Sequence, residues 1–165
     1  MATTAFGDST ANTVGDIPAA GSKAPSFTLV GGDLAEVSSA DLGNTKTVLN
    51  IFPSIGTGVC QTSVRTFNEL ASGLEGTTVL NVSMDLPFAL AGFCGAEGLE
   101  NVSVASGFRS SFGGDYGVTL ADTKFEGLYA RAVVVVDADG TVLHSELVPA
   151  IGQEPDYDAA IAALS

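Results

Sequence analysis

A β-hairpin signal near the C-terminus constrains the fold of this chain more than any other feature of its sequence. Two apolar runs rich in β-branched residues, 132–137 and 141–147, flank Ala138, Asp139 and Gly140. A Gly at the end of such a short connection accepts the positive φ that a tight turn requires. The sequence therefore predicts two adjacent antiparallel strands here, which counts against a purely parallel, doubly wound sheet.

The segments around this hairpin alternate between strand and helix patterns. The predicted strands cover 27–30, 36–37, 47–52, 78–83 and 102–105, the predicted helices cover 59–76, 87–95 and 154–164, and short helical turns are predicted at 38–43 and 108–112. A βαβ half joined to a ββα half is compatible with an α/β, thioredoxin-like fold, a central mixed sheet flanked by helices. A flavodoxin-like fold is the main alternative. The length predicts a single domain over residues 1–165.

The charge balance excludes several classes of partner. Nineteen acidic and six basic residues give a formal net charge of −13, which repels nucleic acid and anionic membrane surfaces. The sequence shows neither an apolar membrane span nor a signal-peptide pattern, so we expect a cytoplasmic protein. In a reducing compartment, two cysteines are better explained by redox chemistry than by a structural disulfide.

Cys60 is the first candidate for that chemistry. It follows a predicted strand, a loop containing Pro53, and the first residues of a predicted helix. Unpaired backbone N–H groups and the positive end of the helix dipole converge at such a position and favour the thiolate. An inert buried cysteine is the alternative, but the loop composition predicts exposure.

Two residues are candidates to assist Cys60. Thr57 lies one helical turn before it, where its hydroxyl can hydrogen-bond a thiolate or a peroxide oxygen, or cap the helix. Arg131 precedes the apolar run 132–136 and is either a surface residue paired with a carboxylate or a catalytic group. Breaking an O–O bond releases an alkoxide or hydroxide, and a guanidinium beside the sulfur stabilises that charge.

Cys94 is a candidate resolving thiol. It lies at the predicted end of the helix 87–95, beside Gly95. A second thiol condenses with a sulfenic acid to a disulfide before the sulfur is oxidised further. The two Cα atoms must come within about 7 Å, so a larger separation requires local unwinding. A cysteine that only packs the helix is the alternative.

Several motifs together resemble one known family. They are Phe52-Pro53-Ser54-Ile55, Thr57-Gly58-Val59-Cys60, Ser63-Val64-Arg65, Gly21-Ser22-Lys23-Ala24-Pro25, Asp85-Leu86-Pro87-Phe88-Ala89, Phe93-Cys94-Gly95-Ala96-Glu97-Gly98, Ala130-Arg131-Ala132-Val133 and Glu154-Pro155-Asp156-Tyr157. Over residues 14–164 the chain resembles the bacterial thiol peroxidases, which are atypical two-cysteine peroxiredoxins.

This resemblance implies a fold, an activity and partners. The fold is thioredoxin-like with an N-terminal β-hairpin. Cys60 is the peroxidatic and Cys94 the resolving cysteine of an intramolecular disulfide, and Pro53, Thr57 and Arg131 complete the pocket. The resemblance further implies a homodimer without cofactor or metal that reduces hydrogen peroxide and alkyl or lipid hydroperoxides in antioxidant defence, with thioredoxin as the reductant.

Other functions fit the residues less well. A cysteine phosphatase would use Arg65 to hold phosphate, but the spacing from Cys60 is one residue too short, and the net charge opposes that substrate. A cysteine protease needs a base, and we expect the only histidine, His144, on the surface of the hairpin. A general disulfide oxidoreductase would need a Cys-x-x-Cys pair. A redox-switched binding module uses the same disulfide and stays open as the alternative.

Overall fold

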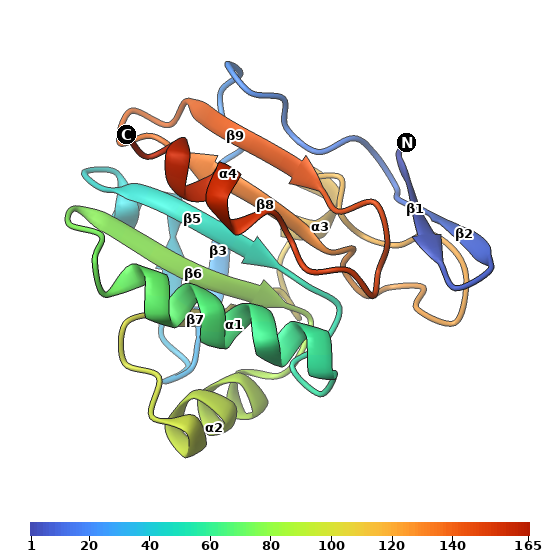
Figure 1. Cartoon of the computed structure of the whole chain (residues 1–165), viewed down its shortest axis with the longest axis horizontal. Coiled ribbons are helices and arrows are strands. Elements are labelled where there is room, and N and C mark those ends of the chain that lie inside the picture. The colour runs from blue at the N-terminus through green and yellow to red at the C-terminus, as the bar shows by residue number, and fades with distance from the viewer.

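The computed structural model describes the whole chain, residues 1–165, as a large sheet with helices packed on it (Figure 1). The elements are β1 Thr3–Phe6, β2 Ser9–Asn12, β3 Thr28–Gly31, β4 Glu36–Ser38, η1 Ser39–Leu42, β5 Lys46–Ile51, α1 Gly58–Ala71, β6 Thr77–Ser83, α2 Pro87–Glu97, β7 Ser103–Ser106, α3 Phe112–Asp115, β8 Ala132–Val136, β9 Val142–Leu147 and α4 Tyr157–Ala162. This is the mixed α/β, thioredoxin-like architecture that the pattern predicts, including the N-terminal hairpin.

The sheet has seven strands in the order β4-β3-β7-β6-β5-β8-β9. Strand β6 pairs in parallel with both β5 and β7, whereas β8 is antiparallel to β5 and to β9. The predicted late hairpin is therefore present, and Gly140 has a φ of 88° in its turn. The parallel strands place the ends of β5 and β6 at the same edge of the sheet, where the loops before α1 and α2 meet.

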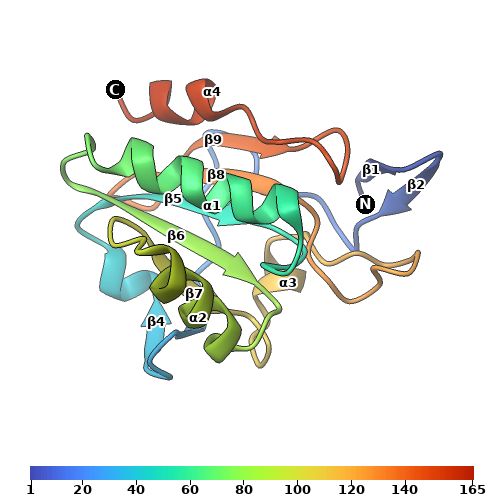
Figure 2. The same ribbon diagram turned by 60° about the horizontal axis from the view of Figure 1, so that its bottom comes forward.

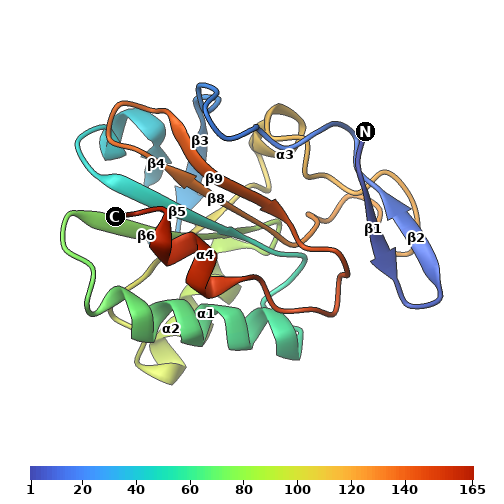
Figure 3. The same ribbon diagram turned by 45° about the horizontal axis from the view of Figure 1, so that its top comes forward.

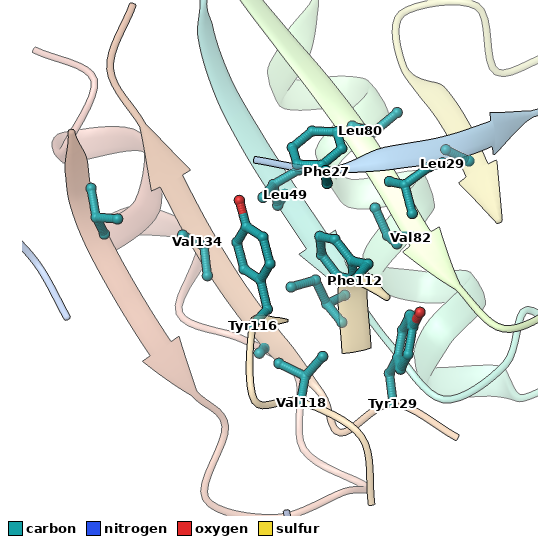
Figure 4. Packing of buried hydrophobic residues seen from close by; sticks show 14 residues of the cluster. Phe27, Leu29, Leu49, Leu80, Val82, Phe112, Tyr116, Val118, Tyr129 and Val134 are labelled. Carbon is teal, nitrogen blue, oxygen red and sulfur yellow. The ribbon is translucent and has the colours of Figure 1, made fainter. Parts of the chain in front are cut away.

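Different helices cover the two faces of the sheet (Figure 2). On one face, Phe67 of α1 and Ala160 of α4 pack on valines of β5, β6 and β8. On the other face lies the largest hydrophobic cluster, in which the rings of Phe112 and Tyr116 stack at 4.3 Å beside Phe27 and Val134 (Figure 4). Burial of this cluster fixes the position of β5, and with it the position where α1 starts.

Several element boundaries differ from the sequence prediction. Helix α1 ends at Ala71 rather than near Gly76, and α4 covers Tyr157–Ala162 rather than 154–164. Helix α2 continues past Gly95 and ends at Gly98, which has a φ of 66° and donates its N–H to carbonyls of the last turn. Gly95 keeps helical geometry because the left-handed φ is needed only where the chain leaves the helix. The helical turn expected at 108–112 lies instead at 112–115, since Phe112 anchors it in the core. No helix in the chain is both long and apolar enough to cross a bilayer.

The N-terminal hairpin β1–β2 stands beside the end of β9 rather than within the large sheet (Figure 3). Its strands pair from Thr3 with Asn12 to Phe6 with Ser9. Ala5 also pairs with Ala150, in the segment between β9 and α4. A two-stranded hairpin is marginal alone in water, so this docking is what holds it.

Candidate active site

Cys60 lies in the first turn of α1, directly after the loop that leaves β5. Thr57 is the N-cap residue, and Cys60 is the third residue of the helix. The first turn contains no acidic residue, so no carboxylate competes for the free backbone N–H groups and the helix dipole. The Cys60 side chain is buried against Phe52, Ile55, Val64 and Leu90. The expected exposure is therefore wrong: the sulfur lies beneath an apolar cover.

Arg131 reaches the sulfur of Cys60 from the start of β8. Its Nη2 donates to Cys60 Sγ at 3.3 Å, and its Nε donates to the carbonyl of Ile151 at 2.9 Å. The guanidinium is 2% exposed, and its Nη1 has no hydrogen-bond partner within the protein. The alternative interpretation required a carboxylate paired with this arginine, but no carboxylate pairs with it. A buried cation with a free N–H therefore lies beside the thiol and can bind a developing oxyanion.

Pro53 and Thr57 bracket the loop before Cys60. Pro53 is buried at the end of β5, where it stops the strand. The Thr57 hydroxyl donates to the carbonyl of Ser54 at 3.1 Å and makes no capping bond to α1. Its backbone carbonyl accepts the N–H of Gln61 at 3.0 Å, while the Gln61 side chain donates to Ile55. These hydrogen bonds connect the loop to itself and to the first turn of α1. No hydrogen bond joins the Thr57 hydroxyl to the Cys60 sulfur.

Asp85 fixes this loop from the neighbouring strand, a position that sequence reasoning missed. Its carboxylate accepts the hydroxyl of Ser54 at 2.8 Å and the backbone N–H of Ile55 at 2.7 Å. Ser83 also donates to it at 2.6 Å. The available signal was a carboxylate immediately after the predicted strand 78–83, since the ends of adjacent parallel strands share one edge. In the sequence, Asp85 otherwise stands out only as the first residue of the motif Asp85-Leu86-Pro87-Phe88-Ala89.

A buried polar chain also supports Cys60 from below. The side chain of Asn50 in β5 donates to Asn81 of β6 at 2.9 Å and to Ser63 of α1 at 3.2 Å. Ser63 in turn donates to the carbonyl of Cys60 at 2.8 Å. All three side chains are fully buried. Because buried polar groups are costly when unpaired, this chain fixes the height of the first helical turn above the sheet.

Cys94 lies on α2 and packs against the same hydrophobic cluster as Cys60. Both thiols are free. Burial raises the pKa of the Cys94 thiol above its ordinary value. Its carbonyl accepts the N–H of Leu99 at 3.0 Å, the bond that closes the end of α2. Cys94 is therefore inside the last turns of the helix.

The side chains of the rival functions point elsewhere. Arg65 pairs with Glu97 at the end of α2 and lies over the ring of Phe93, 5.3 Å from its centroid, so it does not form a phosphate loop with Cys60. His144 is half-buried in β9, where its Nε2 has no partner, and is not the surface residue we expected. No group of three or more potential metal ligands occurs in the chain.

One cavity lies away from this constellation. It has a volume of about 390 Å³ and is lined by residues such as Phe27, Leu49, Tyr116 and Val136, at the opposite end of β5 from Cys60. The Tyr116 hydroxyl already donates to the carbonyl of Pro25 at 2.8 Å. The cavity contains neither a thiol nor a free buried cation, so the chemically equipped site is the one around Cys60.

Comparisons with known proteins agree with this assignment of fold and chemistry. The family described as Redoxin matches residues 19–161. A thiol peroxidase of Mycobacterium tuberculosis is 62% identical over 153 residues, covering 93% of this chain and 92% of the relative. A thiol peroxidase of Corynebacterium glutamicum is 54% identical over 165 residues, covering 100% of both. The crystal structure of a peroxiredoxin-like protein from Aquifex aeolicus superposes with a TM-score of 0.92 at 37% identity, covering 98% of this chain and 95% of that chain.

Proposed function

This chain belongs to the bacterial thiol peroxidases of the Redoxin family and is a thiol-dependent peroxidase, and we propose that Cys60 is its peroxidatic and Cys94 its resolving cysteine. The contact of 3.3 Å between Arg131 Nη2 and Cys60 Sγ carries this proposal. It pairs the nucleophile with the cation that its reaction needs, and both groups are shielded from water.

The first step is attack of the Cys60 thiolate on one oxygen of the hydroperoxide. An S–O bond forms, the O–O bond breaks, and the alkoxide or hydroxide that leaves takes up a proton. Arg131 stabilises the thiolate through Nη2 and offers Nη1, which has no protein partner, to the leaving oxygen. Cys60 then carries a sulfenic acid. We assign Pro53 and Thr57 to the wall of this pocket, since both lie in the loop that covers Cys60.

The second step recaptures the oxidised sulfur. The Cys94 thiolate attacks the Cys60 sulfenic acid, an S–S bond forms, and hydroxide leaves as water. A dithiol reductant, for which we propose thioredoxin, then supplies two electrons and two protons and regenerates both thiols. We place the protein in the cytoplasm, where thiols are kept reduced. We also propose that residues 1–165 act as one domain.

Apolar side chains around the site support two further assignments. Leu86, Phe88 and Phe108 are 54%, 66% and 38% exposed. They lie beside Asp85 and Ser106, which are joined through the Ser106 hydroxyl. We propose that this exposed surface is the interface of a homodimer, because large apolar side chains gathered at one edge favour association. Together with Ile55, it favours alkyl or lipid hydroperoxides as well as hydrogen peroxide.

The test is peroxide consumption coupled to thioredoxin, its reductase and NADPH. Wild type should turn over many equivalents, Cys60→Ser none, and Cys94→Ser should stall after about one equivalent. The two serine variants are matched controls, because each removes one sulfur and keeps a residue of similar size. Sustained turnover by Cys60→Ser would overturn the assignment. A single oxidation of wild type without turnover would favour a peroxide-sensing switch instead.

A further inference from the structure

We propose that the N-terminal hairpin β1–β2 is a positioning element for Arg131, with Thr4 as its key side chain. The inference rests on the proposed function, in which Arg131 activates Cys60 and binds the leaving oxygen. The hairpin itself contacts neither Arg131 nor Cys60. It acts through the backbone segment 148–151, whose carbonyl at Ile151 holds the guanidinium.

The first step is that the position of Ile151 sets the position of the guanidinium. Arg131 Nε donates to the Ile151 carbonyl at 2.9 Å while Nη2 donates to Cys60 Sγ at 3.3 Å. These N–H groups belong to one rigid planar fork, so movement of one acceptor shifts the other contact. The backbone of Val148 also donates to the carbonyl of Arg131 at 3.0 Å. Segment 148–151 thus holds both the main chain and the side chain of Arg131.

The second step is that the hairpin holds this segment. Ala5 donates its N–H to the carbonyl of Pro149 at 2.8 Å and accepts the N–H of Ile151 at 2.9 Å. The hydroxyl of Thr4, which is 2% exposed, donates to the carbonyl of Val148 at 2.9 Å. Ile151 itself lies in a turn, outside any helix or named strand. Strand β1 therefore supplies the regular pairing that this turn lacks (Figures 1 and 3).

The third step is that the hairpin also contacts residues 121–125, which precede Arg131 in the sequence. Asn12 accepts the N–H of Ala121 at 2.7 Å, and its side chain donates to Asp122 at 2.7 Å. Hydrogen bonds from Asn12 lower the pKa of the Asp122 carboxyl. The rings of Phe6 and Phe125 pack edge to face at 5.0 Å. The hairpin is thus bound to segment 148–151 on one side and to residues 121–125 on the other, so it holds these two segments at a fixed separation.

This arrangement gives the hairpin a specific effect on chemistry. Loosening it should let Ile151 drift, which weakens the contact between Arg131 and Cys60 without removing any group from the pocket. Misplacement of a catalytic group by a fraction of an ångström is enough to slow a reaction measurably. The expected signature is a slower reaction of Cys60 with peroxide, without loss of any group from the pocket.

The experiment uses Thr4→Val, which keeps the size of the side chain and removes the hydroxyl that holds Val148. In the Cys94→Ser background, we expect the second-order rate constant of Cys60 with hydrogen peroxide to fall roughly threefold to tenfold. The rate of Cys60 alkylation by iodoacetamide at one fixed pH should fall as well. Thr4→Ser restores the donor and should restore both. Phe6→Ala loosens the other side of the hairpin and should change the rate in the same direction.

The matched control is Thr10→Val, the same substitution at an exposed position of β2, which should behave like wild type. The idea fails if Thr4→Val and Phe6→Ala lose thermal stability but keep the wild-type rate constant and alkylation rate, because the hairpin would then be only structural. Failure of the proposed function itself would show in a different variant, Arg131→Ala. In that case Arg131→Ala would react with peroxide as fast as wild type, whatever the hairpin does.

Discussion

At the scale of single residues, the notable feature of the site is how few polar groups contact the Cys60 sulfur. The sulfur of Cys60 has one polar contact from a side chain, Nη2 of Arg131, and is otherwise enclosed by apolar residues. In such surroundings a charge interaction is screened much less than at the surface. We therefore propose that the geometry of this one arginine dominates the reactivity of the thiol.

The first prediction is that Arg131→Lys slows the reaction although it keeps the charge. A lysine presents one ammonium group and cannot place separate N–H groups on Ile151, the sulfur and the leaving oxygen. We expect the rate constant of Cys60 oxidation to fall roughly 10- to 100-fold, measured by trapping the sulfenic acid. Arg109→Lys is the control, because Arg109 is exposed and lies over the ring of Phe108. An unchanged rate in Arg131→Lys would mean that charge alone suffices.

The second prediction concerns the pH dependence of disulfide formation. Burial raises the pKa of the Cys94 thiol, so the folded helix holds the proton more tightly than an opened one. Its contribution to stability is complete below the unfolded pKa, ~8.5, and is lost as the pH rises through the folded value. Both the opening of α2 and the thiolate fraction therefore increase with pH. The rate of disulfide formation after one equivalent of peroxide should rise from pH 6.5 to 9, and a flat profile would contradict this.

At the scale of elements, α2 is a weak helix. Gly92 and Gly95 lie in its interior, and a Cβ at either would meet no atom within 4 Å. Neither glycine is therefore required by close packing. Each costs about 1 kcal/mol of helix stability relative to Ala. The last turns carry Cys94, and we propose that a low helix stability makes this resolving thiol easier to release.

The third prediction follows from these glycines. Gly92→Ala and Gly95→Ala should each stabilise α2 by ~1 kcal/mol and slow formation of the Cys60–Cys94 disulfide by about fivefold, while the peroxide reaction of Cys60 stays unchanged. Rapid quench and mass spectrometry of the two cysteines would measure both steps. Gly73→Ala, beyond the end of α1, is the control because it also has no atom within 3.4 Å of its Cβ position. Faster over-oxidation of Cys60 should accompany the slower disulfide.

Most elements were predictable because local signals coincide with their packing. The turn at Gly140, the buried strand 47–52 and the helix after Cys60 are each specified by residues within a few positions. The end of α2 was placed at Gly95 because local sequence does not say which of two glycines takes the positive φ. Residues 1–26 offer only a weak extended pattern, since the hairpin at their start is held by segments around Asp122 and Ala150 that are distant in sequence.

The same reasoning explains what was found of the site. Cys60, Cys94 and Arg131 carry reactive groups and stand out by residue type, whereas Asp85, Asn50 and Ser63 act only through contacts across strands. The Thr57 hydroxyl was expected near the sulfur, but the carbonyl of Ser54 is its hydrogen-bond acceptor. A spacing of one turn brings a residue to the right face and does not select between acceptors.

At the scale of the whole molecule, the net charge affects the stability of the fold but not the reaction of Cys60 with peroxide. A formal net charge of −13 on 165 residues makes the folded chain repel itself. The structure contains two ion pairs, Met1–Asp16 and Arg65–Glu97, both at exposed positions where such pairs contribute little. Hydrogen peroxide is uncharged, so the long-range field does not affect its approach to Cys60.

The last prediction follows from this separation. Raising the salt concentration from about 0.01 to 0.5 M shortens the screening length from ~30 Å to below 8 Å, which weakens the repulsion among surface carboxylates. The thermal unfolding midpoint should therefore rise with NaCl. Over the same range, the rate constant of Cys60 with hydrogen peroxide should stay constant, because Arg131 is buried and the substrate is neutral. If that rate constant fell with salt in step with the rise in stability, the contact between Arg131 and Cys60 would have to be open to solvent ions, and the buried pair described here would not be the reactive form.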